Sequence, residues 1–211
     1  MGILTTVVGS YPVPDWLAAL PSEQALADAM AVVIKTQENA GIDLVADGEL
    51  GRFDVNHPDT NGMIEYFVKP LGNVRSQITR GDLDAFRQDE GMSFRARPSA
   101  VVDGPLEEGS LDLPHEFSLA RSLTKEPLKF TLTGPHMLCK TLLDNHYASR
   151  EALCTALADV LASQVAQIDA EVVQVDEANL PGNPDEWEWA LDGINRILRQ
   201  VKTIPAVHLC F

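Results

Sequence analysis

A histidine and a cysteine stand two positions apart in the last apolar segment of the chain. Residues 206–211 read Ala-Val-His-Leu-Cys-Phe, so a single leucine separates His208 from Cys210. Alternate side chains of a β-strand share a face, and this spacing would let both residues hold one zinc ion. Even an open catalytic zinc site takes about three protein ligands. The pair therefore predicts part of a zinc site, and the alternative is an ordinary buried strand in which both residues are structural.

Other polar or turn-forming residues follow apolar runs in the same way. The six groups are Gly9-Ser10, Asp47-Gly48-Glu49, Asp103-Gly104-Pro105, Gly134-Pro135-His136, Asp176-Glu177 and the pair His208 and Cys210. A (β/α)8 barrel builds its site from the C-terminal ends of several strands, whereas a doubly wound sheet uses one or two crevices. No GxGxxG or P-loop motif supports the doubly wound sheet. The pattern favours a barrel.

Helical and strand-like patterns alternate along the chain. Helices are expected from Glu23 to Ala40 with Gly41 as the stop, after the cap Ser149, and from Asn183 with Pro184. Candidate strands begin near Thr5, Ile42, Ala100, Lys129, Val172 and Pro205. This alternation predicts βα units in sequence.

Six units fall short of a closed barrel. We expect an α/β fold, a (β/α)8 TIM barrel of about six βα units with the last two missing. Residues 1–211 would then form a single, C-terminally incomplete catalytic domain. The polar segment 67–98 would be an excursion between the second and third strands. The open edges of such a barrel would favour self-association.

Composition excludes several classes of partner. The chain has 211 residues, 45% of them hydrophobic, and a net charge of -15. Nucleic acids and anionic membranes need a basic surface, so we expect neither as a partner. The apolar stretches are too short to span a bilayer and the N-terminus lacks a basic signal-peptide start, so a cytoplasmic location follows by default. Three unclustered cysteines argue against a disulfide framework.

Six stretches, in order, resemble one known family. They are Thr5-Thr6-Val7-Val8-Gly9-Ser10-Tyr11-Pro12, Asp47-Gly48-Glu49 with Arg52, Met63-Ile64-Glu65-Tyr66-Phe67, Leu132-Thr133-Gly134-Pro135, Gln174-Val175-Asp176-Glu177 and Val207-His208-Leu209-Cys210. Together they resemble the catalytic barrel of cobalamin-independent methionine synthase. The resemblance implies a zinc-dependent transfer of an alkyl group to a substrate thiol, with His208 and Cys210 matching the first two ligands of Zn²⁺. Coordination to zinc deprotonates a thiol and leaves it nucleophilic.

The resemblance also implies a pocket for the amino-acid part of the thiol. Gly9, Ser10, Glu49 and Asp176 are the expected substrate-binding residues. Two carboxylates can pair with an ammonium, while Ser10 and nearby backbone amides can receive a carboxylate. We expect Glu49 and Asp176 to approach each other beside Ser10. The alternative is that Ser10 merely ends a strand and that the two acidic residues cap helices.

Two stretches depart from the family pattern. The segment 136–142 carries no aromatic residue where folate-dependent members have a tryptophan, and 176–180 reads Asp-Glu-Ala-Asn-Leu instead of Asp-Glu-Pro-Ala-Leu. The leading hypothesis is methyl transfer to homocysteine, giving methionine. The first alternative is epoxide opening by a zinc-bound thiolate, as in epoxyalkane:coenzyme M transferase, and the second is an inactive barrel fragment or binding module. The partners are a small-molecule thiol and an alkyl donor.

The remaining histidines and cysteines are expected to be structural. His57 and His136 lie in predicted loops and are left out of the site. Cys139 and Cys154 fall near or on apolar helical faces, which is typical of core cysteines.

Overall fold

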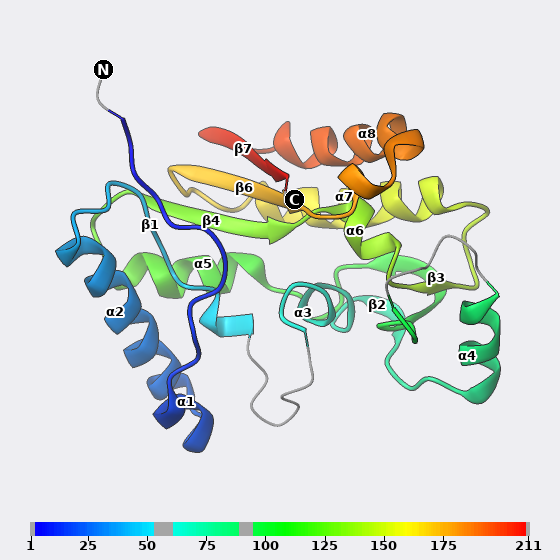
Figure 1. Ribbon diagram of the computed structural model, residues 1–211, viewed down its shortest axis with the longest axis horizontal. Helices are drawn as coiled ribbons and strands as arrows, with labels where there is room; N and C mark the ends of the chain where they lie inside the picture. Colours follow the sequence, from blue (N-terminus) through cyan, green and yellow to red (C-terminus); the bar gives the residue numbers. More distant parts are fainter. Residues whose placement is uncertain (1–2, 53–60, 89–94, 210–211) are drawn as a thin grey trace.

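The computed structural model describes residues 3–52, 61–88 and 95–209 and contains a parallel four-stranded sheet. The order of the strands is β1-β4-β6-β7, and they span Val45–Ala46, Leu128–Thr133, Val172–Glu177 and Ile204–Leu209. Neighbouring positions of the register line up Thr133, Asp176 and His208 across three strands. Figure 1 shows β4, β6 and β7 side by side, with the N-terminal segment running along β1.

The order of the parallel segments separates a barrel from a doubly wound sheet. Thr6 forms a parallel bridge with Leu44, which places the N-terminal segment beside β1. The parallel segments therefore follow one another across the sheet in chain order, without the reversal that defines a switch point. The predicted first strand is reduced to that bridge in the described residues, and the second begins at Val45 rather than near Ile42.

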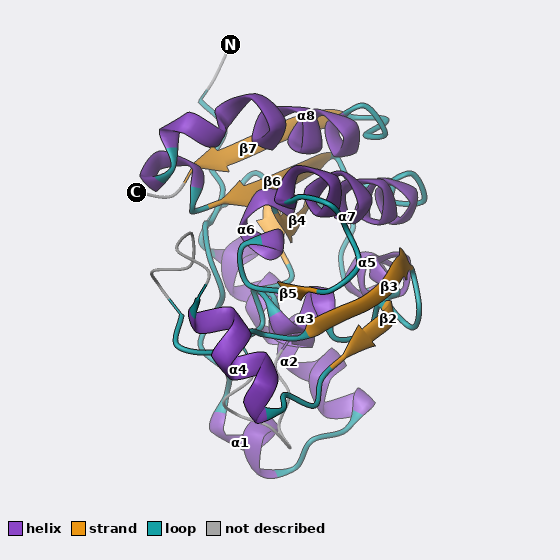
Figure 2. Ribbon diagram, turned by 90° about the vertical axis from the view of Figure 1, so that its right-hand side faces the viewer, coloured by secondary structure: helices purple, strands orange, loops and turns teal. Residues whose placement is uncertain are grey.

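A second, three-stranded sheet lies outside the parallel sheet. It contains β2 (Gly72–Arg75), β3 (Val101–Glu107) and β5 (Leu143–Asp144) in the order β2-β3-β5, with β2 antiparallel to β3. Figure 2 shows β2 and β3 apart from β4, β6 and β7. The prediction that the run from Ala100 supplies a strand of the barrel is therefore wrong. Asp103, Gly104 and Pro105 also lie inside β3 rather than after it.

Polar side chains link β3 to β2, a strand far from it in the chain. Arg75 forms an ion pair with Asp103 at 2.9 Å, and the Asn73 side chain donates to the carbonyl of Pro105 at 2.7 Å. These contacts bind β3 to a strand from the segment 67–98, which the sequence pattern presents only as a polar excursion. That segment also contains α4 (Arg80–Arg87), which has a capping box formed by Thr79 and Asp82.

The helices begin and end largely where local signals predict. Ser22 and Ser149 cap α2 (Glu23–Asn39) and α7 (Arg150–Val165), and Gly41 adopts φ +75° after α2. The third predicted helix opens as a 3-10 turn, Pro184–Glu186, before α8 (Trp187–Leu198). The other helical segments are α1 (Asp15–Ala19), α3 (Glu65–Val68), α5 (Leu113–Ser122), α6 (Pro135–Cys139) and the 3-10 turns Leu50–Arg52 and Leu180–Gly182.

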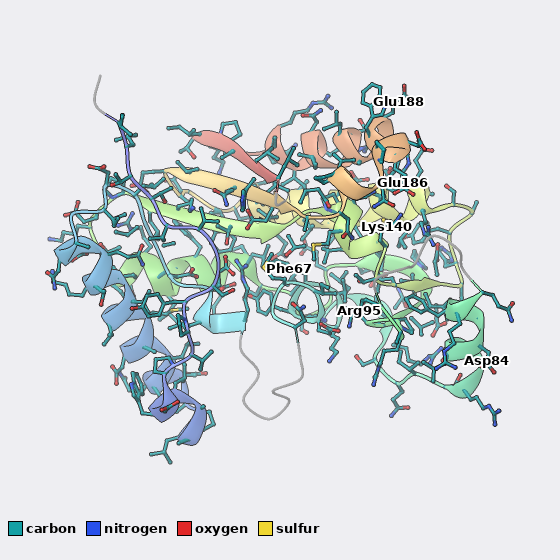
Figure 3. The ribbon with its side chains drawn as sticks, in the orientation of Figure 1. Phe67, Asp84, Arg95, Lys140, Glu186 and Glu188 are labelled. Carbon is teal, nitrogen blue, oxygen red and sulfur yellow. The ribbon has the colours of Figure 1, made fainter. Side chains whose placement is uncertain are left out.

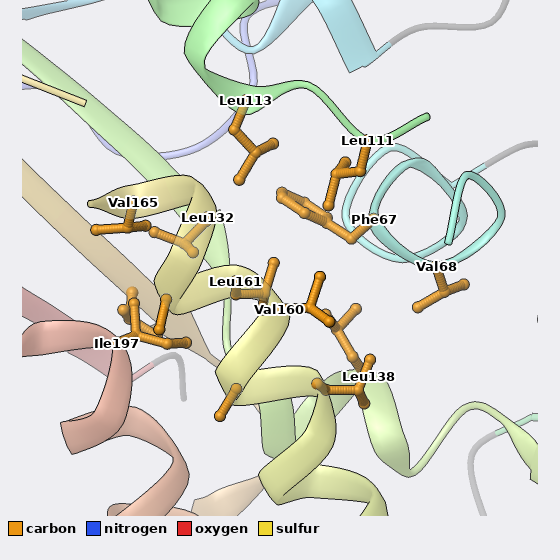
Figure 4. Packing of buried hydrophobic residues seen from close by; sticks show 14 of the residues in the cluster. Phe67, Val68, Leu111, Leu113, Leu132, Leu138, Val160, Leu161, Val165 and Ile197 are labelled. Carbon is orange, nitrogen blue, oxygen red and sulfur yellow. The ribbon is translucent and has the colours of Figure 1, made fainter. Parts of the chain in front are cut away.

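The main core lies between the parallel sheet and its helices. Alternate residues of β4 and β6 enter it, namely Leu128, Phe130, Leu132, Val173 and Val175. Figure 4 shows Leu132 close to Leu161 and Val165 of α7, with Phe67 of α3 facing Leu111 and Leu113. The intervening residues of these strands point to the other side of the sheet. No helix among the described residues is long and apolar enough to cross a membrane.

Candidate active site on the inner face of the parallel sheet

The face of the sheet opposite the helical core is polar. It carries Lys129, Thr131 and Thr133 from β4, Gln174 and Asp176 from β6, and Ala206 and His208 from β7, as their alternation and register require. The inward positions of a TIM barrel are usually filled by bulky aliphatic residues. Buried polar groups need partners, so the contacts on this face define the candidate site.

Glu49 is the most firmly held carboxylate on this face. Ser10 Oγ donates to Glu49 Oε2 at 2.7 Å, and Thr131 Oγ1 donates to Glu49 Oε1 at 3.0 Å. Arg52 Nη1 lies 3.5 Å from Oε2 in a buried ion pair. The carboxylate is thus fixed from three directions, and its contact with Ser10 is the one that the sequence led us to look for.

A strained turn brings Glu49 to this position. Glu49 has φ +59° and the preceding Gly48 has φ +75°, which is the left-handed region that non-glycine residues rarely occupy. A Cβ atom on Gly48 would lie 2.9 Å from both Tyr11 Cβ and Val33 Cγ1. The turn therefore requires glycine at position 48, and its strain at Glu49 is typical of functional sites.

Arg52 is the centre of a buried charge cluster behind Glu49. Its guanidinium lies 5.1 Å from the centre of the Phe67 ring and 3.8 Å, through Nε, from Glu116 Oε1. Tyr66 Oη donates to Glu116 Oε2 at 2.5 Å. Burial raises the pKa of Glu116 to about 7, although the charge of Arg52 opposes this. Burial also raises the pKa of Asp47.

Asp176 lies at the end of β6, opposite His208 on β7. Gln174 Nε2 donates to Asp176 Oδ1 at 2.6 Å, and His208 Nδ1 lies 3.3 Å from the same oxygen. Burial raises the pKa of Asp176, and the negative charge of Glu49 raises it further. The charge of Glu49 therefore reaches Asp176 on the same face of the sheet. Their binding of a common substrate remains a prediction.

The remaining expected site residues are placed less completely. Gly9 has φ +82° and is exposed just before Ser10. Cys210, like His57, lies outside the described residues, so its position relative to His208 is not tested. Within the ranges 3–52, 61–88 and 95–209, no cluster of three or more His, Cys, Asp or Glu residues could hold a metal ion. His208, whose side chain is 35% exposed, is the one predicted zinc donor that the structure describes.

A second polar network lies on the helical side of the sheet. His136 is fully buried, with Nε2 at 2.7 Å from Glu186 Oε2 and Nδ1 at 3.4 Å from Glu177 Oε1. Lys140 Nζ donates to Glu186 at 2.9 Å, and Figure 3 shows these two side chains meeting between α6 and the turn before α8. His136 lies in α6 rather than in the predicted loop, and its full burial supports the structural role expected for it. Cys139 and Cys154 are buried, as expected for core residues.

Comparisons with known proteins agree with the fold. The family described as "Cobalamin-independent synthase, Catalytic domain" matches residues 3–192. The chain belongs to this family. It is 28% identical over 223 residues to the methionine synthase of Sulfurisphaera tokodaii and 29% identical over 223 residues to that of Thermococcus kodakarensis. Each alignment covers 98% of this chain and 61% of the relative, so the chain spans about three fifths of the length of these relatives.

Two solved structures share the fold. The B12-independent methionine synthase from Shewanella sp. W3-18-1, solved in complex with selenomethionine, matches with a TM-score of 0.79 and 27% identity, over 98% of this chain and 61% of its own. A protein from Listeria monocytogenes matches with a TM-score of 0.72, over 99% of this chain and 67% of its own. Its description as a vitamin-B12-independent methionine synthase is a provisional assignment. At 13% identity the second match shows the fold alone.

Several residues of the site were not assigned from the sequence. Thr131, Gln174 and Lys129 contact the predicted site residues or one another, although the sequence indicates them only as parts of strands or motifs. The available signal was alternation, because 128–133 reads Leu-Lys-Phe-Thr-Leu-Thr, with every second residue polar. Such a pattern in a central strand indicates one polar buried face.

Proposed function

We propose that this chain provides the amino-acid pocket of a zinc-dependent enzyme that transfers an alkyl group to a thiol, with the methylation of homocysteine to methionine as its reaction. The observation that carries the proposal is the buried pair of carboxylates on the inner face of the sheet. Ser10 and Thr131 donate hydrogen bonds to Glu49. Asp176 lies on the same face, where the charge of Glu49 raises the pKa of Asp176. An ammonium group between them would satisfy both carboxylates.

Each side chain has a separate task in this proposal. Glu49 and Asp176 bind the ammonium of the substrate. The hydroxyl of Ser10 donates to Glu49, so it orients that carboxylate, while the backbone amides of Gly9 and Ser10 receive the substrate carboxylate. Arg52 holds Glu49 in place from behind through a buried ion pair. This arrangement would fix the thiol end of the substrate by holding its other end.

The donor set fits zinc as far as the chain supplies it. His208 and Cys210 would hold the ion, since an imidazole and a thiolate are ligands that zinc prefers, and further donors are needed for a complete site. The contact between His208 Nδ1 and Asp176 is of the kind that orients metal-binding histidines through a carboxylate. When bound, zinc would lower the pKa of the substrate thiol while leaving it able to attack carbon.

Epoxide opening with coenzyme M is the second candidate. Coenzyme M carries a sulfonate in place of the amino-acid group, so two buried carboxylates in the pocket would repel it. The observation that favours epoxide opening is the segment 136–142, which offers no aromatic residue for stacking a folate. The acidic pocket makes homocysteine the favoured thiol.

A thiol-consumption assay tests the proposal in the natural protein that contains this chain. Homocysteine and coenzyme M are compared with methyl and epoxide donors, and zinc content is measured on the same samples. We expect homocysteine to be consumed, and Glu49→Gln to weaken its apparent affinity by about 30-fold or more, the scale for removing one partner of a buried charge pair. Glu188→Gln on the exposed side of α8 is the matched control. Consumption of coenzyme M alone, or of neither thiol, would overturn the proposal.

A further inference from the structure

A buried lysine lies on the same polar face as the proposed pocket, nearer the start of β4. Lys129 is the second residue of β4 and only 2% exposed. Its Nζ donates to the backbone carbonyl of Val7 at 2.5 Å and to Gln174 Oε1 at 3.3 Å. Burial lowers the pKa of Lys129, while the charges of Asp176 and Glu49 oppose this effect. A buried cation is costly to a fold, so its position calls for a role.

Lys129 decides which way the amide of Gln174 faces. An ammonium group has three donors and no acceptor, so it can contact only the oxygen of the amide. Gln174 Oε1 must therefore face Lys129, and Nε2 must face away from it. Nε2 donates to Asp176 Oδ1 at 2.6 Å. The direction of one hydrogen bond thus fixes the direction of the next.

The same lysine also holds the opposite wall of the proposed pocket. Val7 belongs to the N-terminal segment that bridges to β1 and ends at Gly9 and Ser10. Lys129 therefore connects the segment that carries Ser10 to the strand that carries Asp176. Neither Lys129 nor Gln174 was expected to bind substrate.

We propose that Lys129 and Gln174 are positioning residues, which hold the Asp176 carboxylate in the orientation that receives the ammonium group of the amino-acid substrate. This inference rests on the function proposed above. Without the lysine, the amide of Gln174 can turn over and present its oxygen to Asp176, where two acceptors repel each other. Without the amide, Asp176 loses a short hydrogen bond inside a buried site.

The test compares two ligands that differ only in the group that Asp176 would bind. L-methionine and 4-(methylthio)butyrate share the carboxylate and the thioether, but the second has no amino group. Their dissociation constants are measured by isothermal titration calorimetry on the natural protein that contains this chain, with Gln174→Leu, Gln174→Glu and Lys129→Met as variants. Homocysteine kinetics on the same proteins separate KM from kcat.

We expect Gln174→Leu to weaken methionine binding by about tenfold or more, the scale of a lost hydrogen bond to a buried charged group. Binding of 4-(methylthio)butyrate should change by less than about twofold, and KM for homocysteine should rise more than kcat falls. Gln174→Glu should lose methionine affinity despite its equal size. If Lys129→Met does not fold, the two Gln174 variants still decide the matter.

Gln164 offers a matched control. It is a buried glutamine on α7 whose Oε1 accepts from the Leu113 amide, away from the polar face. Gln164→Leu should lose stability and keep its methionine affinity. Equal weakening of both ligands in the Gln174 variants, or methionine affinity within twofold of the parent, would overturn the positioning role and leave the proposed function standing. A parent protein that binds no methionine would overturn both.

Discussion

Glu116 should make the stability of this chain fall as the pH rises toward neutrality. Its carboxyl group is buried against Arg52 and Tyr66, and burial raises its pKa from 4.5 to about 7. In the unfolded chain the group ionises near its ordinary pKa. Between these two values the folded chain binds more protons than the unfolded chain, so the free energy of unfolding decreases with increasing pH. Below about pH 4.5 both states are protonated and this penalty is absent.

The size of the effect follows from the two pKa values. A difference between about 7 and 4.5, at about 1.4 kcal/mol for each pH unit, gives up to about 3 kcal/mol. Asp47 acts in the same direction, because burial also raises its pKa. Asp82 acts in the opposite direction, since its hydrogen bonds to Arg75 and Thr79 lower its pKa, but that contribution is lost only at much lower pH. A window from about pH 5 to pH 7.5 therefore separates the buried carboxyls from Asp82, and the comparison with Glu116→Gln assigns the part that belongs to Glu116.

Urea denaturation, followed by tryptophan fluorescence at several pH values in this window, measures the effect. The parent chain should lose stability as the pH rises, whereas Glu116→Gln, which has no charge to bury, should show a much flatter dependence. Glu188→Gln changes an exposed carboxylate and should retain the parent's slope. A parent chain and a Glu116→Gln variant that lose stability in parallel would refute the assignment to Glu116.

Two further predictions concern the turn and the sheet edge. Gly48→Ala should lower the free energy of unfolding, measured by heat or urea, by about 1–3 kcal/mol, because its Cβ would lie 2.9 Å from Tyr11 Cβ at φ +75°. An unchanged free energy of unfolding would mean that the turn relaxes freely. Gly182→Ala is the control, because a Cβ there meets nothing within 4 Å. The 211-residue chain should self-associate through the exposed apolar side chains of β7. Val207→Lys should lower the average molecular mass that light scattering measures. A monomeric parent chain would contradict the second prediction.

The sequence predicted the features that depend on local signals. Ser149 caps α7 because its side chain accepts from an amide three residues ahead, and Gly41 ends α2 because it adopts a left-handed backbone conformation. The contact between Ser10 and Glu49 could be anticipated only through the order of the motifs. Gly48 and Thr131 are far apart in the chain, so the sequence does not show that both help to position the Glu49 carboxylate.

Features that depend on the choice of a distant partner were not predictable in this way. The run from Ala100 has the composition of a central strand, but it pairs with β2, where Arg75 forms an ion pair with Asp103 and the Asn73 side chain donates to Pro105. Arg52 resembles a surface residue after a turn, although it is buried beside Glu49 and Glu116. Hydrophobic periodicity carries no information on such pairs, because both partners are polar.

The alternation within β4 and β6 also protects the sheet against misalignment. A slip of one residue between a strand and its neighbours would exchange the two faces of that strand. It would bring Lys129 and Thr131 against the helical core and turn Phe130 and Leu132 toward the polar side. A slipped β4 would therefore bury a charge without its acceptors and lose apolar packing at the same time. The residues that give this face its chemistry thus also enforce the register in which that chemistry is assembled.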